Sequence, residues 1–174
     1  MTGNIWDASA DVAIVIPTNV GWKHNGENVM GRGVARQAAT RYWALAEGYG
    51  YWCKAEGDRL YERVEGDGRR LICFPVKPLA LNPSMSWQQP ADLHLLERSA
   101  VALAALSHRS VWLPLVGCGN GGLNPADVLP ILERLLDDRF TLVELSTAPT
   151  CRRHDPYATT GGDAEPVMPD ANGS

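Results

Sequence analysis

The pattern of apolar and polar residues alternates between short β-branched runs and longer stretches with helical spacing. Four runs, each mostly apolar, have the length and composition of strands that are covered by helices. These runs are residues 11–16, 71–76, 110–115 and 140–145. A weaker run from Leu60 to Val64 predicts a peripheral strand, which a glycine-rich turn at residues 66–68 follows.

Helical spacing falls between these runs. Small and aromatic residues predict a first helix from Val34 to Gly48, and Pro90 opens a second in which leucines repeat up to Leu106. Asn124 is placed to cap a third helix, with Pro125 at its first position. The alternating order of strands and helices predicts an α/β fold, a three-layer α/β/α sandwich around a mixed, mostly parallel sheet.

The apolar pattern also predicts the domain organisation. Residues 1–146 carry all the predicted strands and helices and are long enough to bury a core, so we expect one domain there. From Thr147 the chain is rich in Pro, Gly, Asp, Thr and Ser. Residues 147–174 are therefore predicted to be a disordered tail.

Composition and charge exclude several classes of function. Hydrophobic residues make up 45% and charged residues 21% of the chain, without an apolar span of membrane length, so a soluble protein with no membrane partner is expected. The first residues resemble no secretory signal, which predicts a cytoplasmic location. The net charge of -4 argues against a general electrostatic footprint for nucleic acid, although a local basic groove is compatible with it.

The cysteines predict neither a metal site nor a disulfide framework. They are far apart in the sequence and form no C-x-x-C pair, which is typical of reduced cytosolic thiols. They are Cys53, Cys73, Cys118 and Cys151. We expect no metal and no other cofactor.

The candidate chemistry gathers in a glycine-rich loop between the run 110–115 and the cap Asn124. Glycines let successive N–H groups point into one concavity, and a helix N-terminus adds positive potential, so such a loop favours an anion such as phosphate. A second loop of this kind, residues 31–33, precedes the first predicted helix. Loops at the carboxyl ends of parallel strands, after Ile16, Val76 and Leu115, are expected to converge on one cleft.

Three kinds of phosphate loop compete for this sequence. A nucleotide-triphosphatase loop needs Lys and Ser or Thr after its last glycine, but Leu123 and Asn124 follow Gly122. The dinucleotide fingerprint G-x-G-x-x-G is matched, and Glu144 follows at about the required 20 residues, but the helix start at Pro125 and the short remaining chain disagree with it. The third interpretation is a diphosphate loop late in an α/β domain.

Four sequence pieces together resemble the macrodomain family of ADP-ribose-binding modules, over residues 1–145. They are Gly3-Asn4-Ile5, Asn19 at the end of the first buried run, Met30-Gly-Arg-Gly-Val-Ala35, and Val116-Gly-Cys-Gly-Asn-Gly-Gly-Leu123. With Phe74-Pro-Val-Lys77 between the last two, the chain most resembles the bacterial branch that contains the DNA ADP-ribosyl glycohydrolase antitoxins.

The resemblance implies a set of ligand-binding residues. Asn4 stands where macrodomains usually have an aspartate that accepts a hydrogen bond from adenine, and Asn19 matches the asparagine that contacts the distal ribose. Residues 20–29 are additional to the family pattern and are expected to reshape the mouth of the cleft. The residues expected to bind ADP-ribose are Asn4, Ile5, Asn19, Gly31, Arg32, Gly33, Val34, Gly117, Cys118, Gly119, Asn120, Gly121, Gly122 and Leu123.

The resemblance also implies an activity. Lys77 matches a lysine that the antitoxin branch ties to hydrolysis, so Lys77 and Asn19 are the expected catalytic residues. The implied function is an ADP-ribosyl glycohydrolase that removes ADP-ribose from a modified protein or nucleic acid by cleavage at the distal ribose C1. A non-catalytic ADP-ribose reader, a phosphatase acting on ADP-ribose 1″-phosphate and a nicotinamide-dependent enzyme remain as alternatives, and we expect a monomer.

Several other residues have competing interpretations. Lys77 also fits a solvent-exposed lysine at a strand end, held extended by Pro78. Cys118 lies in the glycine loop, but a small packing residue explains it better than a nucleophile. His24 is expected to be a solvated loop residue, and Trp22 is the tryptophan whose loop position favours stacking on a ligand.

Overall fold

The computed structural model describes residues 1–145, and the predicted tail lies outside the described residues. Six strands form one sheet in the order β1-β6-β5-β2-β4-β3. All neighbouring strands are parallel except β3 and β4, which are antiparallel. The strands are β1 (Thr2–Gly3), β2 (Ala13–Asn19), β3 (Tyr61–Val64), β4 (Arg70–Lys77), β5 (Val111–Pro114) and β6 (Phe140–Leu145).

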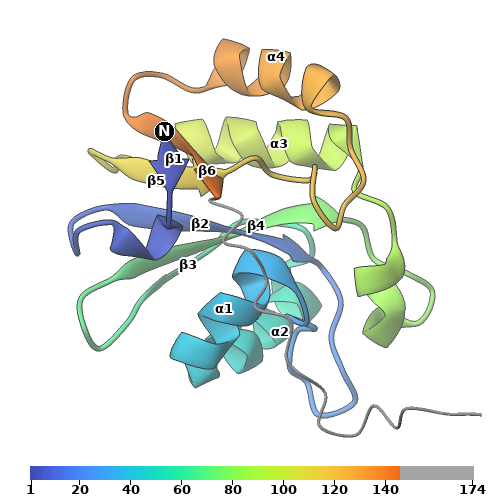
Figure 1. Ribbon diagram of the computed structural model, residues 1–174. Helices are drawn as coiled ribbons and strands as arrows, with labels where there is room; N and C mark the ends of the chain where they lie inside the picture. Colours follow the sequence, from blue (N-terminus) through green and yellow to red (C-terminus); the bar gives the residue numbers. More distant parts are fainter. Residues whose placement is uncertain (146–174) are drawn as a thin grey trace, which may run out of the picture.

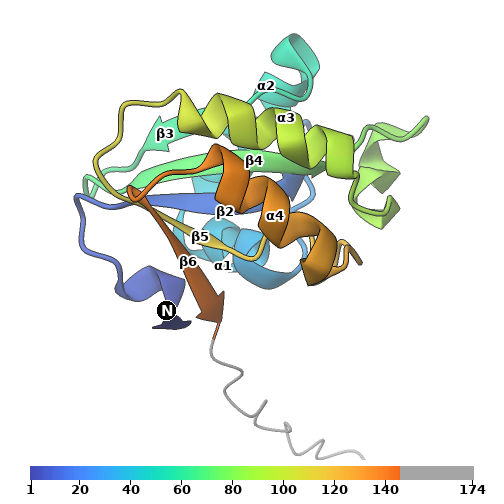
Figure 2. The same cartoon turned by 90° about the horizontal axis from the view of Figure 1, so that it is seen from above.

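Helices cover both faces of this sheet, so the predicted three-layer α/β/α fold is confirmed (Figure 1). On one face lie α1 (Gly33–Arg41) and α2 (Trp43–Glu56), and on the other lie α3 (Leu93–Ala104) and α4 (Pro125–Leu135). Figure 2 shows α3 and α4 side by side across the sheet. Two short 3-10 helices, η1 (Ile5–Asp7) and η2 (Pro83–Gln88), complete the fold.

The central strands are apolar without interruption because each of their faces meets a separate core. In β2, Ile14 and Ile16 pack towards α1 and α2, whereas Val15 packs towards α3 and α4. Successive side chains of a strand point to opposite faces, so only a continuous apolar run satisfies both cores. Each of these fully buried side chains stabilises the fold by about 1.5–3 kcal/mol relative to an exposed one.

The helix predicted from Val34 to Gly48 is wrong as a single element. It breaks at Tyr42, whose φ of -130° and ψ of 79° lie outside the helical region. The Tyr42 hydroxyl donates to Asp67 Oδ2 at 2.8 Å, and its ring lies 6.4 Å from that of Trp6. These contacts come from distant parts of the chain, so local spacing does not reveal them. Beyond the break, α2 continues to Glu56.

Other differences are smaller and have local causes. The second helix begins at Leu93 and not at Pro90, because the Asp92 carboxylate accepts a hydrogen bond from the Leu95 N–H at 2.6 Å and caps the helix there. Asn124 caps α4 as predicted, accepting from the Ala126 N–H at 3.0 Å. The strand β1 has only two residues and is too short to give a sequence signal.

Among residues 1–145 there is no helix of the length and apolar character that crossing a bilayer requires.

Candidate functional site

A cavity of about 750 Å³ opens at the carboxyl ends of β2, β4 and β5. The loops after Ile16, Val76 and Leu115 thus converge on one cleft, as the parallel sheet predicted. Ten of the predicted site residues line it: Asn19, Gly31, Arg32, Gly33, Val34, Lys77, Gly117, Gly119, Asn120 and Gly121.

The first wall is the loop that enters α1. Arg32 occupies the N-cap position, and its side chain caps no helix N–H. The first N–H groups of an uncapped helix have no partner within the helix, so those of Gly33 and Val34 remain available at the cavity wall. Gly33 has a φ of 57°, a left-handed conformation that favours glycine.

The second wall is the glycine loop after β5. Gly117 and Gly122 have φ values of 78° and 79°, and the Leu123 N–H donates to the Gly117 carbonyl at 3.0 Å, which folds the loop into a compact turn. Within residues 1–145, the N–H groups of Gly119, Asn120 and Gly121 donate to no main-chain carbonyl. The two walls approach closely, since a Cβ placed on Gly33 would lie 3.5 Å from Asn120 Nδ2.

Not every residue of the glycine loop faces the cavity. Cys118, Gly122 and Leu123 are absent from its lining, and Leu123 packs against the core beneath α3 and α4. The N-terminus of α4 is also absent, because Asn124 and Pro125 lie beyond the lining residues. The available main-chain donors on this side therefore belong to the loop itself and not to the helix start.

Lys77 lies at the end of β4, directly beside Asn19 in the strand register. Its side chain is half-buried, and Nζ donates a hydrogen bond to the main-chain carbonyl of Trp87 at 2.8 Å. Burial lowers the pKa of the Lys77 ammonium group, and the positive charge of Arg32 lowers it further. A lowered pKa increases the fraction of neutral amine near physiological pH.

Asn19 lines the cavity, but both polar atoms of its side chain form hydrogen bonds within the protein. Its Nδ2 donates to the Val29 carbonyl at 2.9 Å, and its Oδ1 accepts from the Gly21 N–H at 3.0 Å. Asn28, which is fully buried, donates to the Asn19 carbonyl at 2.8 Å and the Gly21 carbonyl at 2.7 Å. These bonds order residues 20–29 into a compact loop against the end of β2.

Asn4 and Ile5 do not line the cavity. Ile5 is fully buried in the core beneath α1 and α2. Asn4 follows β1, the outermost strand next to β6. Its side-chain oxygen accepts a hydrogen bond from the Trp6 N–H at 3.1 Å and caps η1. The structure therefore places these two residues beyond the edge of the cavity.

The sequence did not single out η2 as part of this site, yet Trp87 and Gln88 line the cavity. The Arg32 guanidinium carbon lies 5.8 Å from the centre of the Trp87 ring, so the two side chains meet across the mouth. Trp22, the tryptophan predicted to stack on a ligand, lies outside the cavity and packs against the core beneath α1 and α2. The sequence carried only a weak signal for this, because Trp87 lies ten residues beyond the end of β4 at Lys77.

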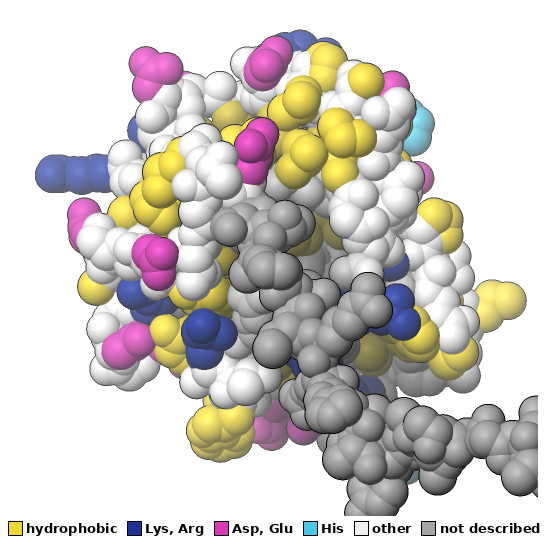
Figure 3. Space-filling model, viewed as in Figure 1, with side chains coloured by type: hydrophobic (Ala, Val, Ile, Leu, Met, Phe, Trp, Pro, Cys, Tyr) yellow, Lys and Arg dark blue, Asp and Glu magenta, His cyan; other side chains and the backbone are white. Residues whose placement is uncertain are grey.

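The charges in the cavity differ from those of the whole molecule. The net charge of the chain is -4, and Figure 3 shows acidic and basic side chains interspersed on one face. Among the described residues that line the cavity, the ionisable side chains are Lys77 and Arg32, without a carboxylate. Two cations and free main-chain donors make this cleft suited to an anion.

Cys118 has none of the features of an activated thiol. Burial raises the pKa of its thiol, and its side chain packs against the core beneath α3 and α4. The interpretation of Cys118 as a packing residue agrees with this position. Cys53 and Cys73 are buried free thiols, and burial raises the pKa of Cys53 to about 12.

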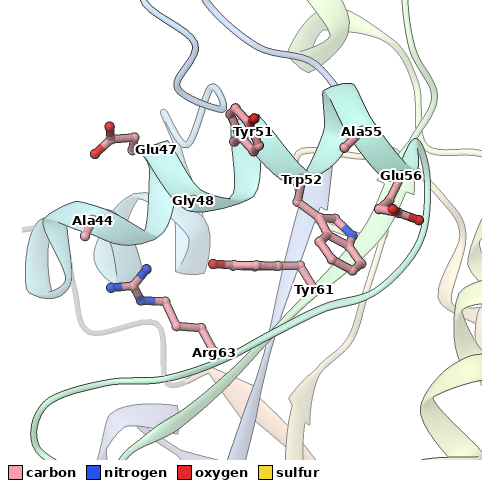
Figure 4. A pocket seen from close by; sticks show the side chains of 9 residues that line it. All are labelled: Ala44, Glu47, Gly48, Tyr51, Trp52, Ala55, Glu56, Tyr61 and Arg63. Carbon is pink, nitrogen blue, oxygen red and sulfur yellow. The ribbon is translucent and has the colours of Figure 1, made fainter.

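A second cavity of about 600 Å³ lies on the outer side of α2, next to β3 (Figure 4). Trp52 and Tyr61 face one another there, with ring centres 5.5 Å apart. Side chains of one helix and one edge strand form its walls, remote from the loops at the carboxyl ends of the parallel strands. It therefore lacks the features that make the first cavity an anion site.

Comparison with known proteins gives the class of this fold. No protein-family model matches the sequence, and no curated protein is significantly similar to it. Solved structures do match, and they show that the chain has the macrodomain fold.

Two of these structures are DarG macrodomains, from Mycobacterium tuberculosis and Thermus aquaticus. Each is 25% identical to this chain, with a TM-score of 0.64, over 83% of this chain and 97% of the other. A third, Thermosipho africanus DarTG in complex with ADP-ribose, has a TM-score of 0.65 at 20% identity, over 83% of this chain and 40% of the other. The resemblance that the sequence indicated is confirmed.

Proposed function

We propose that the cleft binds ADP-ribose, with the diphosphate held between the loop that enters α1 and the glycine loop after β5. The observation that carries this proposal is that both loops present free main-chain donors to a cavity containing Arg32 and Lys77. A cavity of about 750 Å³ is within the usual range for such a ligand. The similar DarTG structure holds ADP-ribose.

We further propose that the protein is an ADP-ribosyl glycohydrolase. The bond between C1 of the distal ribose and the acceptor breaks, water adds to C1, and the proton from water leaves with the acceptor. The transition state resembles an oxocarbenium ion, so a diphosphate held close to C1 stabilises its positive charge. The described residues that line the cavity include no carboxylate that could stabilise this positive charge in place of the diphosphate.

Lys77 is the proposed catalytic residue. A neutral amine that donates one hydrogen to the Trp87 carbonyl keeps its lone pair free to attack C1 of the distal ribose as the acceptor leaves with a proton, and water then breaks the N–C1 bond, which returns the amine and releases ADP-ribose. The lowered pKa of this group supports that role. Asn19, whose side chain is bonded to the protein on both its polar atoms, supports the site by ordering the loop before α1.

The acceptor carrying the ADP-ribose is a modified protein or nucleic acid. To test this, the protein is mixed with an ADP-ribosylated protein and, separately, with ADP-ribosylated DNA, and released ADP-ribose is measured by mass spectrometry. Release that Lys77→Ala abolishes supports the hydrolase. Calorimetric binding of ADP-ribose without release from either substrate would instead identify a reader, and phosphate release from ADP-ribose 1″-phosphate alone would identify a phosphatase.

A further inference from the structure

The short helix η2 reaches Lys77 through its C-terminal end. The Trp87 carbonyl that accepts the hydrogen bond from Lys77 Nζ belongs to this helix. A lysine side chain is long and flexible, so the position of its nitrogen depends on what holds its end. The position of η2 relative to the sheet therefore determines where the amine of Lys77 lies in the cleft.

Two residues behind the cavity wall seat η2. Ser86 is fully buried, and its hydroxyl accepts from the Ala80 N–H at 3.0 Å and donates to the Pro83 carbonyl at 2.9 Å. Gly21 packs against the same turn: a Cβ there would overlap the Pro83 carbonyl oxygen and lie 2.5 Å from Ser86 Oγ. Only glycine permits this approach of two backbones. Neither Gly21 nor Ser86 lines the cavity.

Gly21 is itself fixed to the end of β2. Its N–H donates to Asn19 Oδ1 and its carbonyl accepts from Asn28 Nδ2. Asn19 and Lys77 are direct neighbours on β2 and β4. A continuous series of contacts therefore leads from Asn19 through Gly21 to η2, and from η2 back to Lys77. Because Gly21 belongs to the additional loop 20–29, this loop helps to fix the position of η2.

We infer, on the basis of the proposed function, that Gly21 and Ser86 are positioning residues for Lys77. They hold η2 at the distance from the sheet at which the Trp87 carbonyl meets the amine. They act on the chemical step more than on ADP-ribose binding, because their hydrogen bonds and close contacts within residues 1–145 are with residues 19, 28, 80, 83 and 89 and not with the two diphosphate loops.

The first test separates kcat from binding in Gly21→Ala and Ser86→Ala. A displacement of the amine by about an ångström is expected to lower kcat by about ten- to a hundredfold. Calorimetric Kd values for ADP-ribose are expected to match that of the wild-type protein. Two matched controls are expected to keep kcat: Gly66→Ala, where a Cβ meets open space, and Ser84→Ala, whose hydroxyl bonds, among the described residues, to the N-cap Asn82 of η2.

The second test needs no hydrolysis. The full chain is treated with an amine-reactive reagent across a range of pH, and labelling of Lys77 is followed by peptide mass spectrometry against the exposed Lys54. Both variants are expected to label faster at Lys77 and equally at Lys54, because the released amine is more accessible. Should Gly21→Ala fail to fold, Ser86→Ala decides the outcome.

The two tests distinguish the inference from the proposed function. If Lys77 labelling is altered in the variants but the wild-type protein releases no ADP-ribose, the hydrolase is overturned and the positioning role stands. Unchanged labelling overturns the positioning role, whatever happens to kcat. Parallel loss of kcat and ADP-ribose affinity also overturns it, since this would mean that the variants damage the whole cleft.

Discussion

At the scale of single residues, Lys77 combines two properties that an ordinary surface lysine lacks. Its Nζ is held by a main-chain carbonyl at 2.8 Å, and burial and Arg32 both lower its pKa. The sequence marked the position through its resemblance to the antitoxin branch and through its place at the end of a buried strand. The alternative of an exposed strand-end lysine disagrees with the half-buried side chain and the fixed amine.

The direction of this pKa change predicts how the reaction depends on pH. If the neutral amine is the active form, the single-turnover rate of ADP-ribose release rises with pH and reaches a plateau above an apparent pKa. This apparent pKa is expected to lie below the ordinary value for lysine. Lys77→Arg provides the control, because guanidinium stays protonated and cannot supply a free lone pair, so release is expected to be lost at every pH. Rates that fall with rising pH would show that the protonated form is active.

Arg32 and Trp87 show what a residue-by-residue interpretation of the sequence misses. They are far apart in the chain, and only the meeting of α1 and η2 at the mouth of the cleft brings their side chains together. In contrast, Gly33, Gly117 and Gly122 have the left-handed backbone that favours glycine, a local requirement that a sequence can reveal.

At the scale of elements, the glycine loop after β5 works through its backbone conformation. Gly122 has a φ of 79° with open space around its Cβ position, so a substitution there acts through the backbone and not through a clash. Gly119 lacks a positive φ and lines the cavity, so a side chain there would act by taking up space for the ligand and not through the backbone. Gly122 is therefore the residue that tests whether the shape of the loop matters.

Gly122→Val is expected to reduce ADP-ribose affinity strongly, because a left-handed conformation costs a β-branched residue about 1–2 kcal/mol and the loop relaxes away from its donor arrangement. Isothermal calorimetry measures the effect. Gly57→Val is the matched control, since Gly57 has a φ of 71° and open surroundings at the end of α2, far from the cleft. It is expected to lower the melting temperature and leave affinity unchanged, and equal losses of affinity in both variants would contradict the role of the loop.

The elements themselves were predictable to different degrees, for physical reasons. The strands β2, β4 and β5 could be located because two cores impose an apolar run on each, and the mostly apolar β6 contributes Phe140 and Leu142 to one core and Val143 to the other. The break between α1 and α2 could not, because Tyr42 is held by Asp67 and Trp6, whose proximity only the folded chain creates. The helix η2 was also missed, because it is a short element without periodicity, although Trp87 and Gln88 at its C-terminal end line the cavity.

At the scale of the whole molecule, five parallel strands bring their carboxyl ends to one edge, and that edge gathers the donors and cations of the cleft. An acidic protein thereby presents a locally basic cavity. This arrangement also separates the proposed diphosphate site from the dinucleotide alternative. In that alternative Glu144 binds a ribose, but its Oε2 accepts from Thr2 Oγ1 at 3.4 Å on β6, outside the cavity lining.

A thermal-shift comparison of ligands tests this distinction on the intact fold. A ligand that binds only the folded state stabilises it by about 2.7 kcal/mol at a hundred times its Kd, so ligands at equal concentration rank by affinity. ADP-ribose is expected to raise the melting temperature more than NAD, because the free distal ribose reaches Lys77 whereas nicotinamide must be accommodated beside Trp87. Adenosine, which lacks the diphosphate, is expected to give the smallest shift. A shift with NAD as large as that with ADP-ribose would favour the dinucleotide interpretation, and an equal shift with adenosine would show that the diphosphate is not what the two loops bind.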